Sequence, residues 1–377
     1  MKVEFFKHNI TSVDRKALEK TLKGLFLTTG REVAEFEKKL ATYLGAPYII
    51  GVTSATAGLH LALEALGVGK GDEVITTPMT FVASANAIIH AGAKPVFIDV
   101  EPDTGNLDPS GIEKAITRKT KAILPVSLYG QLPDMRAIKK TARRHKLKVI
   151  EDNAHALEAR RDGYAAGEMA DAAAFSFYAT KNITCGEGGA ISVHSRSLAG
   201  KLIKTRLHGI TRDAAKRHGG GKFTYYDMDR MGWKYNMFNI QAALLINQID
   251  RIERNLKLRQ KVWGWYMKEL GNVEGVEFPA IRPGSRSALH LFTIQVARKK
   301  RDKILNALVE KGIGVSLHFK PAHLMSYYRK NFGFKKGDFP NAEAIGARVI
   351  TLPFYPTLKK AEVKYVAESL LDILHKA

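Results

Sequence analysis

Lys181 lies between two short apolar runs, residues 172–175 and 190–193. Both runs predict buried strands, and Gly188 and Gly189 come directly before the second one. Burial disfavours an ammonium ion, so a lysine held on such a connection loses its proton more readily and becomes an amine nucleophile. The chemistry that suits this amine is a Schiff base with a carbonyl compound. From this stretch alone, an ordinary surface lysine on a loop is an equally good interpretation.

Asp152 ends a third apolar run, residues 149–152, and His155 follows it by three positions. An acid at the end of a strand commonly caps the helix that comes next. The alternative is a carboxylate that stays ionised and pairs with a protonated ring nitrogen of a ligand. The residues at this point are compatible with both interpretations.

Residues 53–58 (Thr-Ser-Ala-Thr-Ala-Gly) join a predicted strand at 47–52 to a predicted helix at 59–66. A hydroxyl-rich turn at the start of a helix presents backbone N–H groups and the positive end of the helix dipole to one point, which suits a phosphate. Ser and Thr are also ordinary N-caps, so a structural role is the alternative. The turn is not a P-loop, because it lacks the Gly-Lys-Ser/Thr ending, and neither are residues 218–222, which no strand precedes.

The elements that must position these residues alternate along the chain. The alternation predicts an α/β fold with a mainly parallel sheet and helices on both faces, and such sheets bind ligands at the carboxyl ends of their strands. Two amphipathic helices are predicted at 13–25 and 33–43, further strands at 73–76, 94–99 and 121–126, and further helices at 82–91 and 134–146.

A smaller C-terminal α/β domain is expected to follow, so that a large domain spans residues 1–245 and the small one residues 246–377. One long helix at 239–270 leads into the small domain. A strand within 312–319 would return to the site and bring His318 with it. The other predicted elements of this part are a strand at 290–296 and helices at 302–310 and 361–374.

The composition describes an ordinary globular chain with an unusual charge: 377 residues, a net charge of +22 and one cysteine, Cys185. One cysteine excludes an internal disulfide and favours a reducing compartment, so we expect a cytoplasmic protein. The N-terminus lacks a signal-peptide pattern, and no run of 18 apolar residues predicts a membrane span. The basic residues are dispersed and form no recognised nucleic-acid-binding motif, so an anionic substrate is favoured over nucleic acid.

Together these residues meet the requirements of one cofactor, pyridoxal 5′-phosphate. They supply a lysine for an imine, a carboxylate for a pyridinium nitrogen, hydroxyls at a helix start for a phosphate, and an aromatic ring, Phe81, to stack on the cofactor. Their joint occurrence in this order is far more specific than any one of them. The spacing of histidine and cysteine predicts no metal site.

The chain resembles the DegT/DnrJ/EryC1/StrS family of sugar-nucleotide aminotransferases over nearly its whole length. The matching segments are 53–58, 71–75, 80–82, 125–131, 151–156, 176–181, 186–189, 232–237 and 241–243. Within the family, residues 181–185, 234–236 and 312–319 are most similar to the UDP-4-amino-4-deoxy-L-arabinose aminotransferase of lipid A modification. The resemblance implies an aspartate-aminotransferase-like fold (fold type I) and a homodimer whose active sites are shared between subunits.

The resemblance also implies roles for individual residues. Lys181 would bind the cofactor and later carry the proton, Asp152 would keep the pyridine nitrogen protonated, and His155 would support that face of the cofactor. The remaining implied cofactor-binding residues are Phe81 at the ring, Ser54, Ala55, Thr56 and Ser176 at the phosphate, and Lys234, which would reach the phosphate of the neighbouring subunit. The implied substrate-binding residues are Thr29, Tyr129 and His318.

The implied reaction moves the amino group of glutamate to a keto nucleotide sugar, most simply a UDP-4-keto sugar, in cell-surface polysaccharide or lipopolysaccharide biosynthesis. Ala55 and Ser127 depart from the family pattern, where glycine and histidine are frequent, and leave the sugar open. One alternative is a sugar dehydratase on the same fold, although those relatives carry a histidine in place of Lys181. The other is a non-enzymatic regulatory or nucleic-acid-binding relative.

Overall fold

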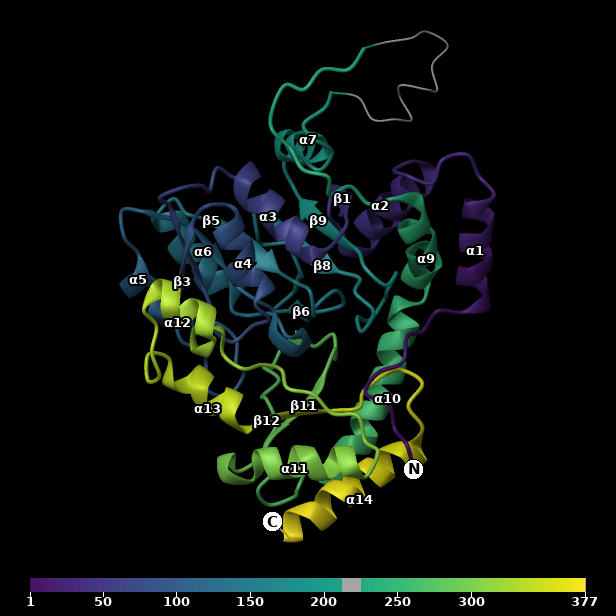
Figure 1. The fold of residues 1–377 in the computed structure, drawn as a ribbon, viewed down its shortest axis with the longest axis vertical. Helices are drawn as coiled ribbons and strands as arrows, with labels where there is room; N and C mark the ends of the chain where they lie inside the picture. The colour runs from purple at the N-terminus through teal and green to yellow at the C-terminus, as the bar shows by residue number, and fades with distance from the viewer. Residues whose placement is uncertain (212–224, 377) are drawn as a thin grey trace.

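A seven-stranded sheet forms the centre of the computed structural model, which describes residues 1–211 and 225–376 (Figure 1). Its order is β1-β9-β8-β5-β4-β2-β3; the strands from β8 to β3 run parallel, whereas β1, β9 and β8 pair antiparallel. The strands are β1 Tyr48–Val52, β2 Glu73–Thr76, β3 Lys94–Phe97, β4 Thr120–Leu124, β5 Lys148–Asp152, β8 Ala172–Ser176 and β9 Gly189–Val193. The predicted mainly parallel sheet is confirmed, while residues 218–222 lie outside the described residues.

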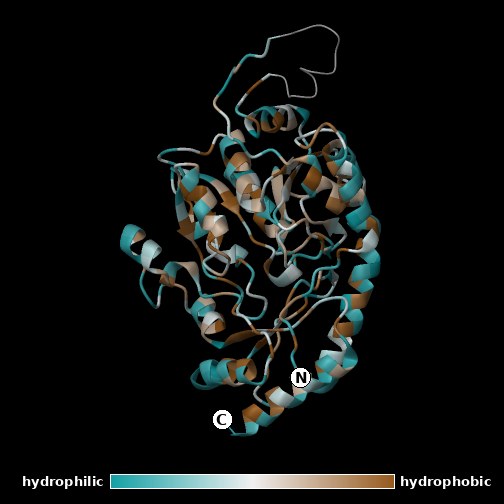
Figure 2. Ribbon diagram, turned by 45° about the vertical axis from the view of Figure 1, so that its right-hand side comes forward, coloured by the Kyte–Doolittle hydropathy of each residue, from teal (hydrophilic) through white to brown (hydrophobic). Residues whose placement is uncertain are grey.

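Helices cover both faces of this sheet because successive strand residues point to opposite sides. In β5, for example, Val149 packs into one hydrophobic cluster and Ile150 into the other. Helices α2, α6 and α9 contribute to the first cluster, and α3, α4 and α7 to the second. These helices are α2 Arg31–Leu44, α3 Ala55–Ala65, α4 Ala83–His90, α6 Met135–Arg144, α7 Arg196–Thr205 and α9 Asn239–Asp250. Figure 2 shows hydrophobic residues on the central strands and many hydrophilic residues on the outer helices.

A two-stranded antiparallel sheet, β11 Phe292–Gln295 with β12 Val349–Leu352, has a hydrophobic cluster of its own. Helices α10 Ile252–Leu270, α11 Arg298–Glu310 and α14 Lys360–Lys376 pack against it, and both chain ends lie in this part of the molecule (Figure 1). The remaining elements are α1 Ser12–Leu22, α5 Ile112–Ala115, α12 Ser326–Phe332, α13 Pro340–Arg348, β6 Arg160–Arg161, β7 Tyr164–Ala165, β10 Ser285–Arg286 and the 3₁₀ helices Pro109–Gly111, Leu128–Gly130 and Ala322–Leu324.

The single helix predicted at 239–270 is wrong, because α9 and α10 are separated at Arg251. The side chain of Arg251 turns back towards the N-terminal part of the chain, where it donates a hydrogen bond of 3.0 Å to the carboxylate of Asp14. Asp14 is fully buried in α1. This long-range ion pair accompanies the break in the helical backbone, and the local pattern of apolar residues carries no sign of it.

The strand predicted within 312–319 is also wrong for the chain as described. Its backbone makes only isolated bridges, from Ile313 to Val3 and from Ser316 to Thr351. The two bridges engage different partners, so no continuous ladder forms. The segment is nevertheless held in place from both sides, which matters for His318 two residues later.

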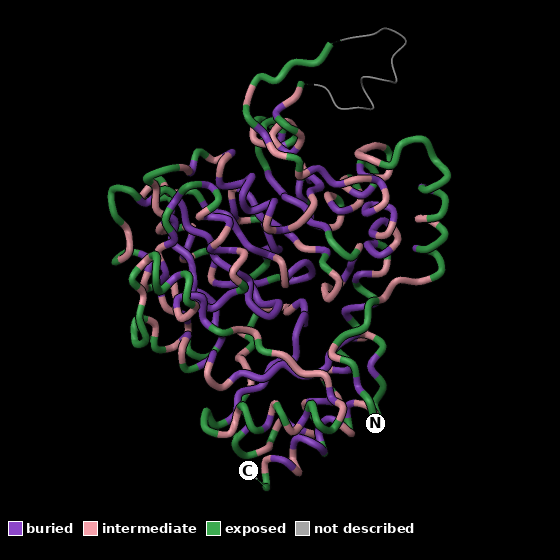
Figure 3. The backbone as a smooth tube through the Cα atoms, in the orientation of Figure 1, coloured by how far each residue is buried: buried purple, intermediate pink, exposed green. Residues whose placement is uncertain are grey.

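Buried residues gather along the central sheet, and exposed ones follow the outer sides of helices such as α1 and α11 (Figure 3). Among the described residues, no helix is both long and apolar enough to cross a bilayer.

Candidate active site

Lys181 lies on the connection between β8 and β9, beyond the carboxyl end of β8. Burial lowers the pKa of Lys181 to about 8, and the carboxylate of Asp152 acts in the opposite direction. An exposed lysine is almost wholly ammonium near neutral pH. This side chain therefore presents a usable fraction of free amine.

Asp152 ends β5, the strand that pairs with β8, so its carboxylate lies at the same edge of the sheet as the connection that carries Lys181. The carboxylate accepts a hydrogen bond of 2.7 Å from Ser84 Oγ and one of 3.1 Å from the Ala154 N–H. Burial raises the pKa of Asp152, whereas these donors and the Lys181 ammonium lower it. Three groups thus support the ionised form of an otherwise buried acid.

Three histidines surround the Lys181 amine: His155, His290 and His318. The rings of His155 and His290 lie 4.5 Å apart, and the Lys181 amine lies 3.5 Å from His290 Nε2. Burial, and then the Lys181 ammonium, lowers the pKa of all three, well below the usual value for His155 and His290 and to about 4 for His318. The three rings are therefore neutral at physiological pH and add no positive charge beside the lysine.

The hydroxyl-rich turn lies against the start of β9. Gly189 approaches the main chain of Ser54 and Ala55 so closely that a Cβ at this glycine would lie 2.4 Å from the Ser54 carbonyl carbon. In the register of the sheet, Gly189 also pairs with Ser176. The structure therefore brings Ser176 and the first turn of α3 together across a residue that has to be small.

The hydroxyls of this turn divide into two roles. Ser54 Oγ accepts a hydrogen bond of 3.1 Å from the Ala57 N–H and is the N-cap of α3. The cap alternative raised by the sequence is therefore true of Ser54. The Thr56 hydroxyl makes no hydrogen bond with another described residue and stands at the positive end of the helix dipole. The Ser176 hydroxyl accepts a long hydrogen bond of 3.4 Å from the Tyr178 N–H.

Phe81 is 60% exposed, although it lies only three positions before Ser84, which contacts the buried Asp152. Its ring lies 6.2 Å from that of Phe319, and Phe319 stacks on His155 at 5.9 Å. An exposed aromatic face at this position is free to cover a flat ligand. The stack also links the loop after β2 to the segment that carries His318.

The residues predicted to bind substrate are held by contacts with the main chain or with another side chain. The Tyr129 hydroxyl donates a hydrogen bond to the His318 carbonyl oxygen, and His318 Nδ1 lies 2.9 Å from the Thr351 hydroxyl. The Thr29 hydroxyl donates to the Met237 carbonyl oxygen at 2.6 Å. Tyr129 therefore positions the segment that carries His318.

Lys234 is exposed and lines a hollow of about 400 Å³ together with Thr28 and Thr53. Its neighbour Asn236 donates a hydrogen bond of 2.8 Å to the Thr29 hydroxyl. Lys234 and Thr29 thus belong to one surface, and no ion pair of Lys234 with another described residue is present.

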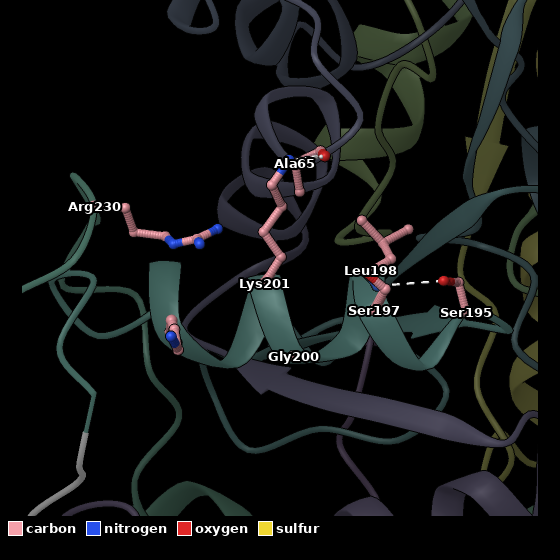
Figure 4. Close-up of a pocket in the computed structure, with 8 residues that line it drawn as sticks. Ala65, Ser195, Ser197, Leu198, Gly200, Lys201 and Arg230 are labelled. Atoms are coloured by element: carbon pink, nitrogen blue, oxygen red, sulfur yellow. Dashed lines mark hydrogen bonds between the residues drawn. The ribbon is translucent and has the colours of Figure 1, made fainter.

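A further hollow, of about 570 Å³, lies between the end of α3 and α7 (Figure 4). Lys201 crosses it and donates a hydrogen bond of 2.8 Å to the Ala65 carbonyl oxygen, and Ser195 caps α7 by accepting from the Leu198 N–H. None of the predicted site residues lines it. These polar groups complete local structure, so we exclude this hollow as the reaction site.

Three residues of the site were missed by the sequence reasoning: His290, Ser84 and Asn182. His290 and Ser84 reach the site from segments far away along the chain. Asn182 belongs to no distinctive motif. The sequence offers one signal for these three residues, which is that Asn182 directly follows Lys181.

The residues present fit pyridoxal phosphate. The lysine amine has a lowered pKa, the buried carboxylate has donors that favour its ionised form, and Gly189 lets the hydroxyl-rich turn lie directly against β9. Among the described residues, His155 Nδ1 is buried without a hydrogen-bond partner. A buried nitrogen without a hydrogen bond lowers the stability of the fold unless a ligand supplies the missing partner.

Comparisons with known proteins point to the same chemistry. The sequence model of the DegT/DnrJ/EryC1/StrS aminotransferase family matches residues 8–371. The spore coat polysaccharide biosynthesis protein SpsC of Bacillus subtilis is 40% identical over 381 residues, covering 99% of this chain and 98% of that protein.

Two solved structures share the fold along the full length. Spr1654 from Streptococcus pneumoniae, assigned as a sugar aminotransferase, superposes in its pyridoxal phosphate form with a TM-score of 0.93 at 31% identity, covering 100% of this chain and 99% of that one. Helicobacter pylori PseC, an aminotransferase of pseudaminic acid biosynthesis, gives 0.92 at 28% identity, with 100% of each chain covered. Spr1654 has also been solved in a pyridoxamine phosphate form.

Proposed function

Because this chain belongs to the DegT/DnrJ/EryC1/StrS aminotransferase family, we propose that it transfers the amino group of glutamate to a keto nucleotide sugar. The chain is a pyridoxal phosphate-dependent aminotransferase, so the proposal concerns its residues and its two substrates. The preferred acceptor is a UDP-4-keto sugar.

One observation carries the assignment of the site: the Asp152 carboxylate at the end of β5 and the Lys181 amine on the connection after the adjacent strand β8 shift each other's pKa. A dehydratase of this fold would need another residue in place of Lys181. Its presence as a partly deprotonated amine supports amino transfer.

Each residue then has a defined task. Pyridoxal phosphate, when bound, supplies a carbonyl that takes up an amine and a ring that accepts electrons. The Lys181 amine would take the proton from the carbon of the amino donor and return it to the carbon of the acceptor. Asp152 would hold the proton of the ring nitrogen, while Thr56, Ser176 and the N–H groups of the first turn of α3 would bind the phosphate.

We further propose a homodimer with shared sites, in which Lys234 reaches the phosphate bound by the neighbouring subunit. Its exposure and its place beside Thr28 and Thr53 support a role outside its own subunit. The net charge of +22 favours anionic substrates such as nucleotide sugars. The name of SpsC, a spore coat polysaccharide biosynthesis protein, supports a role in cell-surface polysaccharide biosynthesis. We propose in addition that this role is cytoplasmic and that lipopolysaccharide is one destination of the product.

The test is the visible absorption spectrum of the purified protein with pyridoxal phosphate, before and after addition of glutamate. We expect a yellow band that glutamate bleaches in the wild type, and no such conversion in Lys181→Ala. A panel of keto nucleotide sugars added to the bleached enzyme then identifies the acceptor by return of the yellow band. A wild type that binds no pyridoxal phosphate, or a Lys181→Ala variant that still converts with glutamate, would refute the proposal.

A further inference from the structure

A chain of buried polar side chains lies behind Lys181, and the proposed function makes no use of it. The Lys181 amine lies 3.5 Å from His290 Nε2, and His290 Nδ1 lies 3.2 Å from Asn182 Oδ1. Asn182 contacts Glu158, which is paired with Arg259 on α10. Four segments of the chain therefore contribute to a line of contacts that ends at the catalytic lysine.

The amide of Asn182 has only one possible orientation. Its Nδ2 donates hydrogen bonds of 2.8 Å to the Glu158 carboxylate and 3.1 Å to the Ala288 carbonyl oxygen, and both of these groups only accept. Its Oδ1 must then be the atom that faces His290. The Glu158 carboxylate is fixed in turn by Arg259, and both side chains are about as buried as the hydrophobic core.

This orientation determines the tautomer of His290. Because Asn182 Oδ1 only accepts, His290 Nδ1 must carry the proton of that hydrogen bond. Burial, followed by the charges of Lys181, His318 and Arg259, lowers the pKa of His290 well below its usual value, so the ring is neutral. A neutral imidazole has a single N–H, which leaves Nε2 with an unshared electron pair directed at the Lys181 amine.

We propose that His290 is a positioning residue for Lys181: its bare Nε2 accepts a hydrogen bond from the lysine amine and so directs the amine's own lone pair towards the reacting carbon. This inference rests on the role of Lys181 in the proposed function. Asp152, His155 and His318 also face the lysine, but among the described residues only His290 has a ring nitrogen within hydrogen-bond distance of Nζ.

The inference assigns a role to the buried ion pair between Glu158 and Arg259. A buried ion pair often adds little net stability, because desolvation of the charges offsets their attraction. Here Glu158 and Arg259 fix the orientation of the Asn182 amide. The Asn182 amide fixes the tautomer of His290, and this tautomer leaves Nε2 as the acceptor for the Lys181 amine. The Asp152 carboxylate acts against the effect of burial on Lys181. A hydrogen-bond acceptor also favours the ammonium form of a lysine, so the proposed bond to His290 acts in the same direction.

The experiment measures the pKa of Lys181 in the full-length, cofactor-free protein. Pyridoxal phosphate is added at a series of pH values, trapped by borohydride reduction, and located by peptide mass spectrometry. In His290→Phe, which removes the acceptor and keeps a ring, we expect the midpoint for Lys181 to fall by about one pH unit. His290→Gln, which restores an amide oxygen near the position of Nε2, should recover most of the shift.

His323→Phe is the matched control, because His323 is a fully buried histidine that pairs with Glu343 away from the site. It should leave the Lys181 midpoint unchanged. In the loaded enzyme, His290→Phe should lower kcat for the glutamate half-reaction about tenfold and leave KM unchanged. An unchanged midpoint in a folded His290→Phe variant would overturn the inference alone, whereas trapping on a different lysine would overturn the proposed function and the inference together.

A second measurement tests the tautomer of His290 in the wild type and therefore does not depend on the folding of His290→Phe. The ¹⁵N NMR spectrum of histidine-labelled wild type distinguishes a ring protonated at Nδ1 from one protonated at Nε2. We expect the Nδ1–H tautomer for His290 in the wild type and its loss in Asn182→Ala. A wild-type ring that carries its proton on Nε2 would refute the inference.

Discussion

Ser84 donates a hydrogen bond of 2.7 Å to the carboxylate of Asp152, and the Thr80 hydroxyl oxygen lies 2.8 Å from Ser84 Oγ. Because the only hydrogen of the Ser84 hydroxyl goes to the carboxylate, the Thr80 hydroxyl must donate to Ser84. Two hydroxyls in series thus point their hydrogens towards one buried acid. This arrangement stabilises the ionised carboxylate that the cofactor's ring nitrogen would require.

The first prediction concerns this pair of hydroxyls. Asp152→Asn should lower the rate of the glutamate half-reaction by roughly 10²–10³-fold, because the charge opposite the ring nitrogen is lost. Ser84→Ala should lower it by about tenfold, since a hydrogen bond to a charged group is worth roughly 1.5–3 kcal/mol. Stopped-flow measurement of the bleaching of the yellow band tests both.

Thr80→Val is the graded control for Ser84→Ala. It removes a donor one step further from the carboxylate, so its effect should be smaller than that of Ser84→Ala. Equal rates in Ser84→Ala and wild type would contradict the role assigned to the hydroxyl.

The second prediction is the pH dependence of Lys181. Burial lowers the pKa of Lys181 from 10.5 to about 8, so the amine is mostly protonated below pH 8 and mostly free above it. Attachment of pyridoxal phosphate to the cofactor-free protein should therefore accelerate with rising pH and level off above about pH 8. Stopped-flow absorbance measures the rate, and a midpoint near 10.5 would show that the lysine is not buried in solution.

The sign of the linked stability follows from the same shift. Between about pH 8 and 10.5 the unfolded chain binds a proton at Lys181 that the folded chain does not, so this residue's contribution to the free energy of unfolding rises with pH in that window. Lys181→Met removes the titrating group. Its free energy of unfolding should lack this rise when the two proteins are compared by urea unfolding across the window.

The third prediction contrasts two glycines. In Gly189→Ala the new Cβ would meet the Ser54 and Ala55 main chain at 2.4 and 2.5 Å, so the variant should lose roughly 3 kcal/mol of stability or more and bind pyridoxal phosphate weakly. Gly200 lies within α7, and apart from its chain neighbours and the helix backbone no atom stands within 4 Å of the position that a Cβ would take. Gly200→Ala should therefore stabilise the protein by about 0.5–1 kcal/mol. Urea unfolding and cofactor titration distinguish the two, and a stable, cofactor-binding Gly189→Ala would contradict the close approach.

The central elements of the site were predictable because local patterns encode them. The short runs rich in apolar residues that become β5, β8 and β9 end at polar residues or begin at glycine, which places Asp152 at the end of β5 and Lys181 on the connection after β8. The alternation of strands and helices then fixes the edge of the sheet where they meet. The division into domains at residue 245 and the role of each site residue are still predictions.

The parts that escaped prediction depend on contacts over long distances in the sequence. His290 meets Lys181 across 109 positions, and Ser84 meets Asp152 across 68. Neither contact follows from periodicity. The break between α9 and α10 is accompanied by another such contact, since Arg251 bonds to Asp14, 237 positions away, while its neighbours keep a helical pattern.

The fourth prediction tests shared sites by complementation between two inactive proteins. Lys181→Ala should be inactive, and Lys234→Ala should be strongly impaired, because each lacks one of the lysines that we place in the same site. If Lys234 serves the neighbouring subunit, a mixed dimer has one site with both lysines mutated and one site with both intact.

Unfolding and refolding the two variants together in equal amounts should therefore restore about a quarter of the wild-type activity, since about half of the dimers are mixed and each has one intact site of two. Each variant refolded alone is the control. If Lys234 acted within its own subunit, a mixed dimer would contain no intact site, and the mixture would show only the average of the two variants. Size-exclusion chromatography with light scattering, run on the same samples, establishes that dimers have formed, so that a lack of recovery bears on the position of Lys234 and not on assembly.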